Sequence, residues 1–245
     1  MKVNDLLLLS GNDIPFPEAK IVIHQPRIRE IAFMGEDGFY GGCEFLKFSK
    51  DNLTEEDRIN LEKYSNFEVL MSIMKENNEI VNKHKVYVQM LFALLFPQYK
   101  MVISDGAFEL QLEDNKFFID KNNFESFKEV LDDMFCLKGD SSEEYRPIGE
   151  AAKKIAEKLK KRHQKLNQEK TESEKKISVL NRYISILSVG EHKDMNSLLD
   201  YTVYQLFDEF KRYQLKESYD IYFQAKMAGA QDLKEPEDWM QDIHK

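Results

Sequence analysis

"KMVISDGAFELQLEDNKFFID", residues 100–120, decides the fold class of this chain of 245 residues. Phe108, Leu110 and Leu112 alternate with polar neighbours, which is the pattern of a strand with one buried face. Asp105 and Gly106 separate this arm from the apolar arm before it, and such a pair between strand patterns is a strong hairpin signal. A third arm, "KFFID", follows "EDN". The stretch therefore predicts a small antiparallel β-meander near residues 100–120.

Helical patterns surround the meander. Residues 86–96, "VYVQMLFALLF", form the most apolar segment of the chain and end at Pro97, which favours a buried helix. After the meander, apolar residues recur at helical spacing: Phe124, Phe127, Val130, Leu131, Met134 and Phe135. Nearer the start, the β-branched residues 21–23 predict a strand, and residues 26–35 predict a helix that stops at Gly35. The fold class we expect is α+β, mostly helical, with the meander in the N-terminal half.

Four glycines, at positions 35, 38, 41 and 42, resemble a phosphate-binding loop only in composition. Neither the G-x-G-x-x-G nor the G-x-x-x-x-G-K-[ST] spacing is present. We therefore predict a flexible loop between helices. For the neighbouring Cys43, we favour a buried small hydrophobic residue over a reactive thiol.

The best candidate for a linker is the stretch at residues 139–147, "GDSSEEYRP". Its Gly, Ser and Pro content predicts a linker between a mixed N-terminal domain, residues 1–138, and a helical C-terminal domain, residues 148–245. In the second domain we expect one long basic helix, or two, ending at Gly190. A last helix should begin near residues 194–197, "DMNS", and run to Gly229.

The charge distribution is uneven. The chain carries a formal charge of −9, which argues against a chain-wide nucleic-acid footprint. Residues 153–176 nevertheless contain ten basic and four acidic residues. This segment is either a nucleic-acid arm or a solvated helix that pairs with acidic protein surface, and we favour the second interpretation. The basic patch that would mediate either contact is Lys158, Lys161, Arg162 and Lys165.

No pattern in the sequence indicates a catalytic or metal site. The two cysteines are too few for a disulfide framework, and the five histidines are scattered without the spacing of metal ligands. Neighbouring acidic residues would point about 100° apart on a helix and could not share a proton. We expect a protein that is not an enzyme and has no cofactor. No apolar run reaches the length of a signal-peptide core or a membrane span, so we expect a soluble intracellular protein.

An aromatic residue recurs at every third position through residues 201–215, "YTVYQLFDEFKRYQL". On an α-helix a period of three drifts by ~60° per step, so the rings spiral around the helix and need neighbours on more than one face. They could fill the core, stack on bases or dock a partner chain. Asp200, Asp208 and Glu209 disfavour base stacking, and core packing is favoured over partner contact. The partner-binding candidates are Tyr201, Tyr204, Phe207, Phe210, Tyr213, Tyr219 and Tyr222.

Two stretches resemble proteins of the tail-gene region of tailed bacteriophages, which are called tail assembly chaperones or tail-associated structural proteins. One is residues 194–244, through "YTVYQLFDEFKRY" followed by "AKMAG", and the other is "DIPFPEAKIVIHQPRIREIAFMGE", residues 13–36. The resemblance rests on the general character of these stretches and on the spacing of their residues. It assigns no site residues.

This resemblance implies a non-enzymatic protein of virion morphogenesis that acts in the host cytoplasm or in the virion. Its expected partners are other phage tail proteins, namely tape-measure, tube or baseplate subunits, and further copies of itself. A membrane partner is not expected, and nucleic acid is disfavoured. An alternative class is a permanent structural subunit of the tail or virion. A weaker one is a nucleic-acid-associated regulator that acts through residues 153–176.

Overall fold

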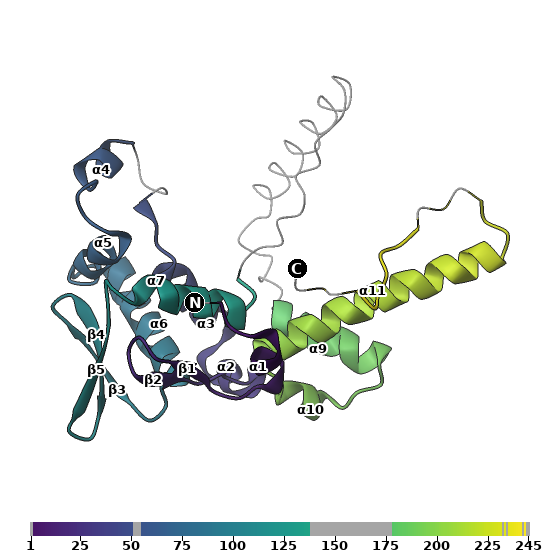
Figure 1. Cartoon of the computed structure of the whole chain (residues 1–245), viewed down its shortest axis with the longest axis horizontal. Coiled ribbons are helices and arrows are strands. Elements are labelled where there is room, and N and C mark those ends of the chain that lie inside the picture. Colours follow the sequence, from purple (N-terminus) through teal and green to yellow (C-terminus); the bar gives the residue numbers. More distant parts are fainter. Residues whose placement is uncertain are drawn as a thin grey trace.

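The computed structural model describes residues 2–50, 55–137, 178–231, 233, 235–241 and 243 (Figure 1). The predicted linker at 139–147 and the predicted basic patch, Lys158, Lys161, Arg162 and Lys165, lie outside the described residues. The domain boundary that we placed at the linker therefore stays a prediction.

The described elements alternate short strands with helices. The first half contains α1 (Asp5–Ser10), β1 (Ile14–Phe16), β2 (Ile21–Ile23), α2 (Ile28–Met34), α3 (Glu36–Leu46), α4 (Glu55–Asn60), α5 (Asn66–Ile73) and α6 (Glu79–Leu95). The second half contains β3 (Lys100–Ser104), β4 (Ala107–Leu112), β5 (Asn115–Asp120), α7 (Phe124–Met134), α9 (Val179–Gly190), α10 (Met195–Leu199) and α11 (Val203–Met227). The α+β class is confirmed.

The predicted meander is present as an antiparallel sheet in the order β3-β4-β5. Ile103, Phe108 and Ile119 lie side by side across its three strands. Gly106 closes the β3–β4 turn with a φ of 84°, a conformation that glycine adopts without strain. A second antiparallel pair, β1 and β2, contains the strand predicted at residues 21–23, and the helices predicted on either side of the meander are α6 and α7.

The loop predicted at the four glycines was wrong, because this stretch forms α3. A Cβ on Gly42 would lie 3.0 Å from the backbone oxygen of Tyr87 and 3.3 Å from Cβ of Leu91, both in α6. A Cβ on Gly41 would lie 2.9 Å from the ring of Tyr87. The glycines therefore let two helices approach closely. Cys43, on the same helix, is buried as predicted, with 2% of its surface exposed.

The single helix predicted from residues 194–197 to Gly229 was also wrong, because it is interrupted after Leu199. Thr202 caps α11: its hydroxyl accepts from the N–H of Gln205 at 3.3 Å, and the Gln205 side chain accepts from the N–H of Thr202 at 2.8 Å. This reciprocal pair satisfies two donors that a helix start leaves free, so a new helix begins here. The predicted end at Gly190 is confirmed, and α11 ends at Met227, two residues before the predicted end at Gly229.

One buried cluster joins the early and late parts of the chain. Its centre contains the rings of Phe92, Phe96, Phe108 and Phe127, which neighbour one another. Side chains from α9, α10 and α11 belong to the same cluster: Leu180, Ile184, Leu187, Leu198, Val203, Tyr204, Leu206 and Phe210. The sheet β3-β4-β5 lies at one end of the molecule and α11 projects from the other (Figure 1).

Candidate functional site

The ring-bearing helix α11 begins inside the core. Val203, Tyr204, Leu206 and Phe210 are buried. Phe210 stacks on Tyr183 of α9, with ring centroids 3.7 Å apart and planes at 11°. The hydroxyl of Tyr204 lies 3.3 Å from a carboxylate oxygen of Asp5 in α1. Burial next to this carboxylate raises the pKa of Tyr204, so the phenol stays protonated and donates the hydrogen bond. For these two rings the structure favours the core-packing interpretation.

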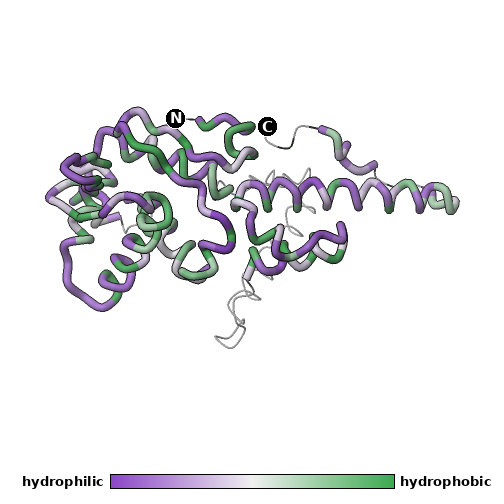
Figure 2. The backbone as a smooth tube through the Cα atoms, turned by 90° about the horizontal axis from the view of Figure 1, so that it is seen from below, coloured by the Kyte–Doolittle hydropathy of each residue, from purple (hydrophilic) through white to green (hydrophobic). Residues whose placement is uncertain are grey.

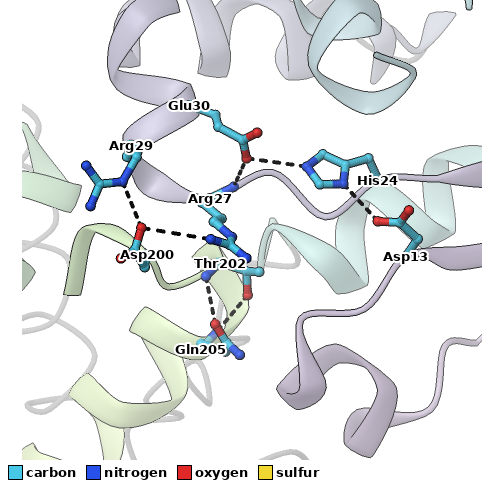
Figure 3. A network of polar contacts seen from close by, with 8 residues as sticks. All are labelled: Asp13, His24, Arg27, Arg29, Glu30, Asp200, Thr202 and Gln205. Atoms are coloured by element: carbon cyan, nitrogen blue, oxygen red, sulfur yellow. Dashed lines mark hydrogen bonds and ion pairs between the residues drawn. The ribbon is translucent and has the colours of Figure 1, made fainter. Parts of the chain in front are cut away.

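The corner between α10 and α11 is attached to the start of α2 (Figure 3). Arg29 donates to Asp200 at 2.7 Å, and the N–H of Ile28 donates to the carbonyl of Tyr201 at 2.8 Å. The hydrogen bond from Arg29 lowers the pKa of Asp200. Since the corner fixes where α11 starts, these contacts set the direction in which the helix leaves the body.

A histidine between two carboxylates supports the same junction. The Nδ1 of His24 lies 2.8 Å from Asp13, and its Nε2 lies 3.3 Å from Glu30 (Figure 3). Glu30 also accepts from the backbone N–H of Arg27 at 2.6 Å, which caps α2. The network thus joins the ends of the β1–β2 pair to α2. Arg29, on the same helix, in turn joins α2 to the base of α11 through Asp200.

The second half of α11 leaves the core and carries exposed apolar side chains on more than one of its faces. Ile221 is 62% exposed, Phe223 41% and Met227 88%. The half-buried rings of Tyr219 and Tyr222 lie 4.6 and 5.4 Å from the ring of Phe223. In Figure 2 this part of the helix extends beyond the body with apolar and polar residues mixed along it. We call residues 214–227 the projecting half of α11.

The C-terminal segment folds back onto the middle of α11. Arg212 donates to the carbonyls of Trp239 and Gln241 at 2.8 and 2.7 Å, and Lys211 donates to the carbonyl of Ile243 at 3.3 Å. Ile243 is itself buried. The segment is thus held at the turn of α11 that contains residues 211 and 212, just before the projecting half begins.

An open cavity of about 700 Å³ lies beside α3 and α6. Its wall includes Phe45 and His84, which stack with centroids 4.9 Å apart, and Lys47, which pairs with Asp132 at 2.9 Å. Cys43 lines it, but burial raises the pKa of this thiol to about 12. A thiol with that pKa is protonated near neutral pH and is a poor nucleophile.

The described residues contain neither a metal site nor a membrane-spanning helix. Among them, no group of three or more His, Cys, Asp or Glu side chains could hold a metal ion. Of the helices in the same parts of the chain, none is both long and apolar enough to cross a membrane.

One comparison, with models of known protein families, indicates that the protein is of phage origin. Residues 170–244 match the model of a family described as YomV second domain, which is a phage-associated family. The matched region includes α9, α10, α11 and the C-terminal segment. No curated protein and no solved structure matches the chain. The match supports a phage origin for the protein.

Within this matched region, the predicted partner-binding residues divide into three groups. Tyr204 and Phe210 are buried in the chain's own core, and Tyr201, Phe207 and Tyr213 pack against it. Tyr219 and Tyr222 lie on the projecting half. Reasoning from the ring period missed the exposed Ile221, Phe223 and Met227, which lie beyond the regular stretch. The available signal was the apolar pattern that continues beyond the regular ring stretch to Met227.

Proposed function

We propose that the protein is a non-enzymatic protein-binding factor of bacteriophage tail morphogenesis. It holds a tape-measure, tube or baseplate protein during assembly, and the projecting half of α11 is its client-binding surface. The observation that carries this proposal is the exposure of Ile221, Phe223 and Met227 on a helix that has left the core. Large apolar side chains gathered on an exposed element typically mark an interaction site.

Three features of the molecule support this function. The base of α11 is fixed by the Arg29 to Asp200 contact and by the Thr202 cap, so the helix presents its side chains from a rigid support. Tyr219 and Tyr222 combine an apolar ring with a polar tip, which suits a surface that is wet in one state and covered in another. The phage-associated family model covers this helix.

Co-purification tests the proposal. Phage tail proteins should be retained by the native chain and lost when Ile221, Phe223 and Met227 are all changed to Asp. The matched control is Phe33→Asp on α2, because Phe33 is 91% exposed but lies on another element. Retention by the triple variant equal to that of the native chain would contradict the assignment of this surface.

A permanent structural subunit of the tail or virion is the second candidate, because an exposed apolar helix also suits a fixed subunit interface. Purified particles separate the two functions. An assembly factor should be absent from them, whereas a structural subunit should be present in a stoichiometric amount.

A further inference from the structure

The C-terminal segment leaves the end of α11 and returns to the middle of the same helix (Figure 1). We infer that this segment, residues 228–243, is a displaceable strap. It occupies a peptide-binding site at Lys211 and Arg212, and a client segment of the same chemistry takes its place. The inference rests on the proposed function, because it identifies the internal contact that a client must break and the kind of segment that the client must present.

The chain reverses its direction at the end of α11 through local contacts. Gly229 has a φ of 89°, a left-handed conformation that ends many helices. Its N–H donates to the carbonyl of Lys226 at 3.1 Å, and the N–H of Ala230 donates to the carbonyl of Ala225 at 3.0 Å. These bonds satisfy carbonyls that the helix end would leave free. Because the turn does not depend on where the strap is bound, release of the strap should leave α11 intact.

The strap is held mainly through its backbone. Arg212 donates to the carbonyls of Trp239 and Gln241, and Lys211 donates to the carbonyl of Ile243. Every residue of any protein carries such a carbonyl, so these two cations can bind another peptide in the same way. Among the strap's described apolar side chains, Ile243 alone is buried, with 8% of its surface exposed. The site therefore recognises peptide carbonyls together with one apolar anchor.

The hold on the strap is weak enough to be broken. The described residues from 230 to 243 form neither a helix nor a strand. Leu233 is 40% exposed and Met240 70%. A segment with little buried apolar surface and no regular structure opens at a low free energy. The strap is thus the part of this region that a competing segment can displace.

The strap is also longer than its path along the helix requires. The ten residues that lead from Gly229 to Trp239 can span ~33 Å when extended. Between Arg212 and Met227 the helix rises only ~22 Å. This slack lets the strap leave its site while α11 stays fully wound.

The strap binds on the side of α11 that carries part of the client-binding surface. Phe223 follows Arg212 by eleven residues, which places the two side chains only ~20° apart around the helix. A client that lies along Phe223 and extends toward the body of the molecule therefore meets the strap at Arg212. The client and the strap compete for this part of the helix.

The composition of the strap indicates the kind of client segment that replaces it. Residues 228–243 contain five acidic residues and one basic residue, which complements the charge of Lys211 and Arg212. We expect an acidic client segment with a large apolar residue. Because the strap is tethered, its effective concentration is roughly millimolar. It should therefore occupy the site until a client binds, and it should lower the apparent affinity for that client.

Fluorescence of the full chain tests how the strap is held, because Trp239 is the only tryptophan. Ile243→Asp should release the strap, shift the emission of Trp239 to longer wavelength and raise its quenching by acrylamide at least twofold. Met240→Asp is the matched control, because Met240 lies three residues away and is exposed. It should leave both signals unchanged. Native emission and quenching in Ile243→Asp would overturn the assignment of the anchor. Circular dichroism verifies that each variant keeps the native helix content.

A peptide added in trans tests the site itself. A fluorescently labelled peptide of residues 230–245 should bind the full-length Ile243→Asp chain at least tenfold more tightly than the native chain, whose own strap fills the site. Adding Arg212→Glu to the Ile243→Asp chain should weaken this binding at least tenfold, because it removes the donor to two carbonyls. Fluorescence anisotropy measures both. Equal affinity of the native and Ile243→Asp chains for the peptide would overturn the strap.

The two proposals fail separately. Ile243→Asp should retain at least threefold more tail protein than the native chain in the co-purification. Equal retention by both chains overturns the competition between strap and client and leaves the client-binding function in place. If the peptide binds as expected but neither chain retains tail proteins, the client-binding function alone is overturned.

Discussion

At the scale of the residue, Gly42 shows how a missing side chain determines packing. The residue sits in the middle of α3, where glycine costs about 0.5–1 kcal/mol relative to alanine. Its Cα faces the backbone oxygen of Tyr87 so closely that a Cβ would lie 3.0 Å from it. The close contact between α3 and α6 therefore offsets the unfavourable helix propensity of this glycine.

We expect Gly42→Ala to lower the free energy of unfolding by about 1–3 kcal/mol, because a backbone oxygen within a helix cannot move aside as a flexible side chain can. Gly38→Ala is the matched control on the same helix. Its Cβ would meet side-chain atoms at 3.4 and 3.5 Å, which is ordinary contact. This variant should be neutral or stabilised by up to about 1 kcal/mol. Denaturant unfolding compares the two, and equal effects would contradict this account of the glycines.

Asp200 makes the corner at the base of α11 sensitive to acid. The hydrogen bond from Arg29 lowers the pKa of Asp200 in the folded chain below the ~3.9 of an unfolded aspartate. A lowered folded pKa contributes stability that is fully present above the unfolded pKa and is lost as the pH falls through the folded pKa.

Arg29→Gln should therefore lower the free energy of unfolding near neutral pH, and the difference from the native chain should shrink as the pH falls below about 4. Because both side chains are about half exposed, the effect should be modest. Unfolding measured at several pH values checks this. Curves for the two proteins that stay parallel down to the lowest pH would show that Asp200 is not the group involved.

At the scale of the element, the sequence predicted the parts whose periodicity is local. The meander, α6 and α7 are signalled by alternation, by the pair Asp105 and Gly106, and by a long apolar run, all of which act within a few residues. The glycine-rich α3 was missed because its stability comes from contact with α6, some 45 residues further along the chain. The break before α11 could have been predicted, since Thr202 and Gln205 form a capping box that the apolar period concealed.

The two halves of α11 should respond differently to the same substitution. Phe210→Ala should lower the free energy of unfolding by about 3–5 kcal/mol, because Phe210 is only 8% exposed and stacks on Tyr183. Phe223→Ala, on the projecting half, should change it by less than about 0.5 kcal/mol. Chemical denaturation measures both. A large loss at Phe223 would mean that this ring packs against the chain itself and is not available to a partner.

At the scale of the whole molecule, late elements complete a core that early ones begin. Leu187, Leu198 and Leu206 are fully buried in the same cluster as Phe39 and Phe108. Such contacts between distant segments leave no trace in local sequence patterns, so the composition of the 139–147 stretch was the only basis for dividing the chain. The exposure of the projecting half is also a property of the whole molecule, because it depends on where the core ends.

This shared core predicts that the two parts of the chain depend on each other. A fragment of residues 1–137 alone should not unfold cooperatively, because it exposes the apolar surface that α9, α10 and the start of α11 cover. Mixing it with a fragment of residues 138–245 should restore a cooperative transition, since contacts such as Arg29 to Asp200 and Tyr204 to Asp5 join the two across the gap. Calorimetry and near-ultraviolet circular dichroism measure this recovery. If the first fragment unfolds alone at the temperature of the intact chain, it is an independent domain, and α11 projects from a separate unit that could move relative to it.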